Sequence, residues 1–334
     1  MRRREFITLF GGVAVAWPLA ARAQKTPVVI GFLGSQAAAP PPKDPQTVAL
    51  NQGFLDYGLI QGRDFILEHR FTAGDDERFP EFARDLARLN ARMILANTPA
   101  GVRAAQRLDP PLPVVMIIMN DPVGAGLVAS LAHSGNHTTG TANLNEDVTP
   151  KLLEFLREIV PKARVLAVLF NPLNPTNAVI LENLRVTAAS VGITVLPIAL
   201  KPRDDLDALF AALAAQRPDA LQIIGDPGIG DLRDRIAALA QMHRLLLFST
   251  SPLIVEAGGL VSYGASVYKI LRRTGYYVKK ILDGADPADL PIEQARAARP
   301  ERRAGAGIAE RDRKPSEEAL RGKADSETKS NSFN

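Results

Sequence analysis

The sequence predicts an α/β protein made of two Rossmann-like lobes, each with a parallel sheet, joined by a hinge. Short β-branched runs alternate with amphipathic stretches along the chain, which is the pattern of βαβ units. The alternation breaks at the polar run HSGNHTTG, residues 133–140, and starts again at Val165. A single continuous sheet is the alternative, but this break and restart favour two lobes.

The first series of elements consists of four apolar runs. Each is followed by a stretch in which apolar residues recur with the spacing of one helix face. The runs are VVIGFL, FILEHR, MILA and VVMIIM, and residues that favour turns or helix caps follow each of them. We expect strands at 28–33, 65–70, 93–96 and 114–119, and helices at 47–57, 79–89, 102–108 and 123–132.

The second series repeats this architecture without repeating its letters. Its apolar runs are VLAVLF, TVLPIA, ALQII and LLLF. We expect strands at 165–170, 194–199, 220–224 and 245–248, and helices at 150–160, 178–191, 205–215 and 232–242. A short strand at 260–263 and a helix at 267–282, which ends at the C-cap Asp283-Gly284, follow the second series.

Residues 1–23 have the three parts of an export signal. Arginines at 2–4 form a basic head, residues 7–19 form an apolar core too short to cross a bilayer, and residues 21–23 form a small-residue cleavage site. The pattern fits both the Sec and the twin-arginine routes. We therefore expect a periplasmic protein.

The composition excludes several classes of protein. The formal net charge is +4, and most of it lies in the arginines of the N-terminal segment, so the folded part lacks the clustered cations of a nucleic-acid-binding surface. The chain has no cysteine, which excludes disulfides, thiolate metal sites and cysteine nucleophiles. We expect a monomer that binds a small molecule and no nucleic acid.

The C-terminal residues 286–334 depart from the pattern of the rest of the chain. After Pro291 large apolar side chains are too few to offset the entropy of ordering the segment. We expect this tail to be disordered.

Polar side chains follow most of the predicted strands. Ligands of doubly wound parallel sheets bind at the carboxyl ends of the strands, so these residues are candidates for ligand contacts. The candidates are Ser35, Gln36, Asn97, Thr98, Asp121, Asn171, Asp226, Thr250 and Tyr263. Helix capping is the alternative role, because four of them stand directly before a proline suited to a first helical turn. The two roles are compatible, since helix N-termini in a cleft attract anions.

No catalytic or cofactor motif stands out in the sequence. His133 and His137 have the spacing of metal ligands on a helix, but the glycine and asparagine between them favour a loop. His69 is isolated, and we expect it to face outward on a strand. The chain has neither a GxxxxGK[ST] nor a GxSxG motif, and GDPGIG at 225–230 lacks the GxGxxG spacing. We expect no metal, no cofactor and no enzymatic activity.

Several runs of the sequence resemble one family. They are the N-terminal signal, PVVIGFLGS, DPVGAGLVASLAHSGNHTTG, LLEFLREIVPKARVLAVLFNPLNP, and AGGLVSYGAS with YYVKKILDGADPADLPIEQ. Together they are similar to the substrate-binding proteins of ABC transporters, whose members include tryptophan- and tyrosine-binding proteins of the TrpX type. The resemblance covers residues 1–294 and stops where the tail begins to diverge.

This resemblance implies a type I periplasmic binding fold with three crossovers between the lobes and the ligand enclosed between them. It implies a periplasmic solute-binding protein of an ABC importer, which closes around an amino acid or another small carboxylate and delivers it to a permease in the inner membrane. All candidate positions except Asn97 and Thr250 match loops at which the family binds its ligand. The resemblance also implies that residues 260–284 belong to the first lobe. The expected domains are a signal at 1–23, a first lobe at 24–140 plus 258–285, a second lobe at 141–257 and a tail at 286–334.

Two other functions are compatible with parts of the sequence. An exported α/β enzyme acting on a small polar substrate would need an acid-base pair in the cleft. A transcriptional regulator with the same fold would need a helix-turn-helix before the first lobe, where the signal stands instead. A binding protein agrees best with the signal, the two lobes and the polar strand ends.

Overall fold

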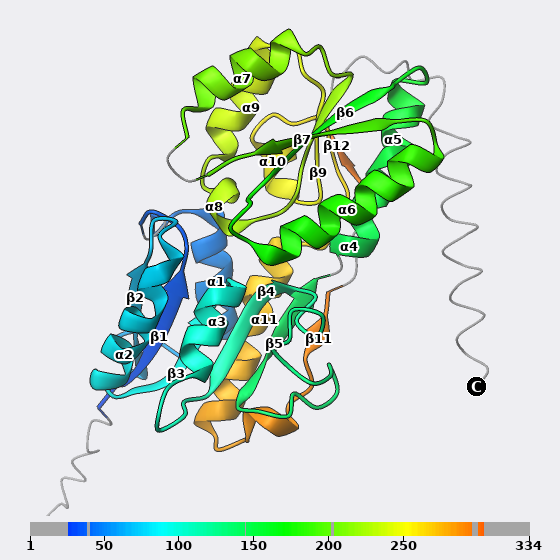
Figure 1. The fold of residues 1–334 in the computed structure, drawn as a ribbon. Helices are drawn as coiled ribbons and strands as arrows, with labels where there is room; N and C mark the ends of the chain where they lie inside the picture. The colour runs from blue at the N-terminus through cyan, green and yellow to red at the C-terminus, as the bar shows by residue number, and fades with distance from the viewer. Residues whose placement is uncertain (1–25, 39–40, 144, 202–203, 296–299, 304–334) are drawn as a thin grey trace, which may run out of the picture.

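The computed structural model describes residues 26–38, 41–143, 145–201, 204–295 and 300–303. The predicted signal and residues 304–334 of the predicted tail lie outside the described residues. The described chain forms two six-stranded sheets, each with helices on both faces, and these make up two lobes (Figure 1). The predicted fold class of two lobes with mostly parallel sheets is confirmed.

The first sheet has the strand order β11-β5-β4-β3-β1-β2, and every pair in it is parallel. Its strands are β1 (Val28–Gly34), β2 (Phe65–Phe71), β3 (Ala91–Ala96), β4 (Val114–Asn120), β5 (Thr138–Asn143) and β11 (Glu293–Gln294). One face packs on α2 (Phe79–Arg88) and α3 (Pro99–Gln106), and the other on α1 (Pro45–Asp56) and α11 (Val267–Leu282).

The second sheet has the order β12-β10-β9-β8-β6-β7, and only β12 runs antiparallel to its neighbour. Its strands are β6 (Val165–Phe170), β7 (Thr194–Ala199), β8 (Ala220–Ile223), β9 (Leu247–Ser249), β10 (Val261–Ser262) and β12 (Glu301–Arg302). The helices on one face are α5 (Leu152–Ile159) and α6 (Pro175–Ser190). Those on the other are α7 (Leu206–Ala215), α9 (Arg233–Met242) and α10 (Pro252–Glu256). Two short helices, α4 (Asn145–Val148) and α8 (Pro227–Gly230), stand near the junction of the lobes (Figure 1).

Polar residues at strand ends cap the following helices, as the sequence pattern predicts. The Thr98 hydroxyl accepts a hydrogen bond from the backbone N–H of Gly101 at 3.1 Å, and Pro99 opens α3. Asp226 caps α8 in the same way. Because these helices begin where the strands end, the strand ends and the helix N-termini of each lobe lie along the same edge of its sheet.

The segment after β4 differs from its prediction. The expected helix at 123–132 is absent, and two successive turns and a bend take its place. Gly126 has a φ of 66°, which ends any helix there. The predicted break at 133–140 contains the start of β5, whose run TTGTAN is fully buried although it has almost no apolar residue. Gly140 is required in this strand because a Cβ would overlap the backbone of Met116.

The C-terminal part of the chain also differs from its prediction. β10 pairs with β9, so Val261 and Ser262 add to the second sheet although they were expected in the first lobe. Residues 286–295 and 300–303 of the expected disordered tail belong to the fold, because β11 pairs with β5 and β12 pairs with β10. Backbone ladder bonds order this segment, and its buried side chains Leu290 and Ile292 join the core of the first lobe.

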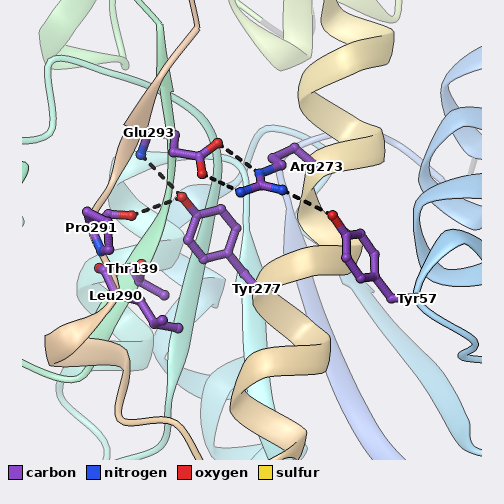
Figure 2. Close-up of polar contacts among 7 residues, drawn as sticks. All are labelled: Tyr57, Thr139, Arg273, Tyr277, Leu290, Pro291 and Glu293. Atoms are coloured by element: carbon purple, nitrogen blue, oxygen red, sulfur yellow. Dashed lines mark hydrogen bonds and ion pairs between the residues drawn. The ribbon is translucent and has the colours of Figure 1, made fainter.

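Side-chain contacts hold β11 against the first lobe (Figure 2). The fully buried Tyr277 of α11 donates a hydrogen bond to the carbonyl of Pro291 at 2.9 Å and accepts one from the backbone N–H of Glu293 at 3.2 Å. Arg273 pairs with the Glu293 carboxylate, Nη2 to Oε1 2.5 Å, and donates to the Tyr57 hydroxyl at 3.0 Å. This network fixes the point from which the chain crosses to the second lobe.

The chain passes between the lobes three times: after β5, after β10, and between β11 and β12. The third passage runs partly through residues outside the described ranges. Among the described helices, none is long and apolar enough to span a bilayer.

Candidate ligand site between the lobes

A cavity of about 520 Å³ lies between the two lobes. Gln36 after β1 and Asn97 after β3 line it from the first lobe, and Asp226 after β8 and Thr250 after β9 line it from the second. The carboxyl ends of strands in two separate sheets therefore face one enclosed space. Doubly wound sheets bind ligands at this edge, which makes the cavity the candidate site.

Four of the nine candidate residues lie in the cavity wall, and the other five lie elsewhere. Ser35 and Thr98 are buried directly beside wall residues, and the Thr98 hydroxyl is used as a helix cap. Asp121 closes a turn outside the wall, where its Oδ1 accepts from the backbone N–H of Gly124 at 2.8 Å. Its role in this turn thus accounts for the residue.

Asn171 and Tyr263 also lie outside the cavity wall. Asn171 donates from Nδ2 to Asp226 Oδ1 at 3.2 Å and so supports a wall residue without being one. Tyr263 packs edge-on against the ring of Phe155, with the ring centroids 5.7 Å apart. The side chain of Tyr263 therefore belongs to the core beneath the second sheet.

Asp226 is the centre of the polar network in the second lobe. Its Oδ1 accepts from the backbone N–H of Gly228 at 3.0 Å as well as from Asn171, and its Oδ2 accepts from Asn174 Nδ2 at 2.9 Å. Asn174 lines the cavity and caps α6, which begins after it. These bonds fix the carboxylate in one position in the wall.

Asparagines dominate the wall on the side of the first lobe. Asn97 Nδ2 donates to Gln36 Oε1 at 3.2 Å, and Asn120 Oδ1 accepts from the backbone N–H of Asn145 at 3.2 Å. Asn143 stands at the end of β5 and is buried, whereas Asn97 and Asn120 are half-buried. Sequence reasoning missed Asn143 and Asn145 as candidates. At the polar strand end Asn120-Asp121 it favoured Asp121, although Asn120 is the residue that lines the cavity.

His69 lines the cavity, so the expectation that it faces outward is wrong. In the register of β1 and β2 it stands beside Phe32, and its side chain lies on the same face of the sheet. The imidazole stacks on Phe71 and is tilted against Phe32, with centroids 5.3 Å apart in both pairs. Desolvation lowers the pKa of His69, and the weaker field of Glu68 opposes this. The imidazole is therefore neutral at neutral pH.

Besides the hydrogen bond between Asn120 and Asn145, three polar contacts bridge the lobes beside the cavity. The backbone N–H of Ala37 donates to Asp231 Oδ2 at 3.3 Å, and Arg233 pairs with Asp44 at the same distance. Near the crossover after β10, the Tyr268 hydroxyl of α11 donates to Glu256 Oε2 of α10 at 2.6 Å. The described residues contain no cluster of three or more histidine, aspartate or glutamate side chains arranged to hold a metal ion.

Comparison with known proteins agrees with this architecture. The model of the family described as "ABC transporter substrate binding protein" matches residues 43–299. A curated relative, the "Tyrosine-binding protein" of Clostridioides difficile (strain R20291), is 22% identical over 259 residues, which are 77% of this chain and 74% of the relative.

Two solved structures share the fold. A conserved domain protein from Vibrio cholerae has a TM-score of 0.70 and 22% identity, and the match covers 82% of this chain and 91% of that one. An ABC domain from Streptococcus pneumonia in complex with L-Trp has a TM-score of 0.69 and 20% identity, with the same coverage.

Proposed function

Since the chain belongs to the ABC transporter substrate binding protein family, we propose that it is the periplasmic solute-binding protein of an ABC importer. Proteins of this family bind small ligands, work with ABC permeases and are not enzymes. The ligand that we propose is an amino acid or another small carboxylate. Support comes from two similar proteins, one named a tyrosine-binding protein and one solved in complex with L-Trp.

The observation that carries this proposal is the cavity with walls from both lobes. A ligand that touches Asn97 in one lobe and Asp226 in the other gains both sets of contacts only when the lobes are closed. Binding therefore shifts the population toward the closed state. A permease that recognises closed lobes then receives only loaded protein.

The proposal is tested on the chain from residue 24 onward with a thermal-shift screen of amino acids and small carboxylates. A ligand at about 100 times its Kd raises the free energy of unfolding by about 2.7 kcal/mol. We expect at least one compound to raise Tm and to reduce the radius of gyration in solution scattering. A screen in which no compound does both contradicts the proposal.

Matched variants locate the binding site. Asp226→Asn keeps the capping oxygen of α8 but removes the charge from the cavity wall, so it should weaken the binding of the compound that the screen identifies. Asp121→Asn changes an aspartate that closes a turn outside the wall and should bind as the wild type does. Equal loss in both variants would argue against this cavity.

The proposed location and partner have their own tests. Cell fractionation should find the protein in the periplasm, cleaved after residue 23, and light scattering should give the mass of a monomer. Release of the bound compound in vesicles that carry the matching permease would establish delivery. Recovery of the uncleaved chain in the cytoplasm would contradict the proposed location.

A further inference from the structure

The charged side chains of the cavity wall are unbalanced toward the negative. Asp226 and Asp231 are its carboxylates, and Arg233 is the one permanently charged cation among the described wall residues. The Arg233 guanidinium is already engaged, because Nη2 pairs with Asp44 at 3.3 Å and Nη1 donates to the carbonyl of Gly230 at 3.3 Å. An anionic ligand group would have to compete with Asp44 for it.

Carboxylates of the first lobe face those of the second. The pKa of Asp76 is raised, first by desolvation and further by the charge of Asp226 in the other lobe. The pKa of Asp231 is raised, again first by desolvation, with added contributions from Asp44 and Asp226. Closure of the lobes thus brings like charges together, and a cation between them would offset this cost.

Buried amide oxygens give an independent indication. Asn143 lines the cavity and is 7% exposed, and its Oδ1 has no hydrogen-bond partner among the described residues. Asn97 Oδ1 also has no hydrogen-bond partner among the described residues, while the amide nitrogen of Asn97 donates to Gln36. A buried acceptor without a donor is costly, so a ligand that supplies N–H or O–H groups to both oxygens would be stabilised here.

We propose, in an inference that rests on the proposed function, that a positively charged nitrogen group, an ammonium or a guanidinium, anchors the ligand. A carboxylate on the ligand is then dispensable for binding. The cationic group donates to Asn97 and Asn143, and Asp226 and Asp231 balance its charge. The apolar part of the ligand then lies toward Phe32 and other apolar wall residues of the first lobe, among them Leu50, Leu67, Phe71, Ile117 and Leu271.

The experiment compares matched triplets by calorimetry: an amino acid, the amine without its carboxylate, and the acid without its amine. The probes are tyrosine, tyramine and 3-(4-hydroxyphenyl)propanoate, with the corresponding tryptophan and leucine series. We expect the amine to bind within about tenfold of the amino acid, and the acid to bind at least about 100-fold more weakly. An acid that binds as tightly as its amine overturns the inference and leaves the proposed function standing. If no member of any series binds, the inference fails, and the proposed function stands or falls by the wider screen of amino acids and small carboxylates.

A pair of variants near the start of α9, one just before the helix and one in its first turn, tests the charge itself. Asp231→Asn preserves the shape of a wall residue and should weaken the amines about three- to tenfold, with a shallower dependence on salt. Asp234→Asn makes the same change in the first turn of α9, on an exposed aspartate outside the wall, and should leave the affinity unchanged. Equal affinities for the amines in Asp231→Asn and the wild type would contradict the role of this carboxylate.

Discussion

Asp44 of the first lobe and Arg233 of the second lie against each other at the edge of the cavity, with Oδ2 and Nη2 3.3 Å apart. The side chains are only 10% and 22% exposed. Asp44 also caps α1, where its Oδ1 accepts from the backbone N–H of Gln46 at 2.9 Å. One carboxylate thus starts a helix in one lobe and binds a cation of the other. Separation of the lobes would break the pair, so it favours the closed arrangement.

Arg233→Met should therefore shift the protein toward the open arrangement without ligand. A partly shielded ion pair contributes about 1 kcal/mol, which is about a fivefold change in the ratio of closed to open molecules. The measurement is the radius of gyration of the ligand-free protein by solution scattering, which should increase. Arg235→Met is the control, because Arg235 pairs with Asp207 inside the second lobe and both side chains are more than half exposed. An unchanged radius in Arg233→Met would show that the pair does not hold the lobes.

Tyr277→Phe should destabilise the first lobe by removing one oxygen. The hydroxyl of this fully buried residue satisfies the carbonyl of Pro291 and the backbone N–H of Glu293. Loss of the oxygen removes both of these hydrogen bonds from a buried site, which costs about 1–3 kcal/mol. Urea unfolding measures the change. Tyr276→Phe, on the neighbouring and partly exposed ring, should cost much less. Equal effects would mean that the two hydrogen bonds contribute nothing specific.

Gly275→Ala should separate two helices that pack with their backbones in contact. A Cβ at Gly275 of α11 would overlap the carbonyl oxygen of Gly53 in α1, and a Cβ at Gly53 would overlap the backbone of Arg272. Backbone atoms cannot yield as a flexible side chain can, so we expect a loss of at least about 1–3 kcal/mol in the free energy of unfolding. Gly230→Ala is the control, since a Cβ there meets nothing within 4 Å. A stable Gly275→Ala protein would show that the helix pair can shift.

The alternation of apolar runs predicted the two sheets because parallel strands are buried on both faces and read as continuous apolar segments. β5 escaped this rule. Its threonines are buried by pairing and by hydrogen bonds, such as that from Thr139 to the carbonyl of Leu290 at 2.9 Å, and not by apolar character. β11 and β12 were not predicted either, because strands of two residues are held by backbone hydrogen bonds and need no apolar run.

The site was predicted by the general rule that ligands lie at strand ends, but the rule does not say which of two consecutive residues faces the ligand. Gln36 and Asn97 line the cavity, and their neighbours Ser35 and Thr98 do not. Asn143 could not be a candidate because its strand was not recognised. His69 was misplaced because its direction depends on the register of β2 against β1, and no local pattern gives that register.

His69 should make the stability of the ligand-free protein depend on pH in one direction. Its folded-state pKa is lowered by desolvation beside Phe32 and Phe71, so the unfolded chain binds the proton more readily than the folded protein does. The contribution of His69 is therefore present above its unfolded pKa of about 6.5 and is lost as the pH falls through that value toward the folded pKa.

His69→Phe keeps an aromatic ring in the cluster and removes the titration. Urea unfolding of both proteins between about pH 8 and pH 5 should show that the wild type loses more stability on acidification than the variant does. The pKa values of Asp76 and Asp231 are raised, so these carboxylates change the stability with pH in the opposite direction. Both proteins contain them, so their contributions cancel in the difference between the two pH profiles. Identical pH profiles would mean that the imidazole is solvated in the folded protein, and the cavity wall around it would then have to be more open than the structure shows.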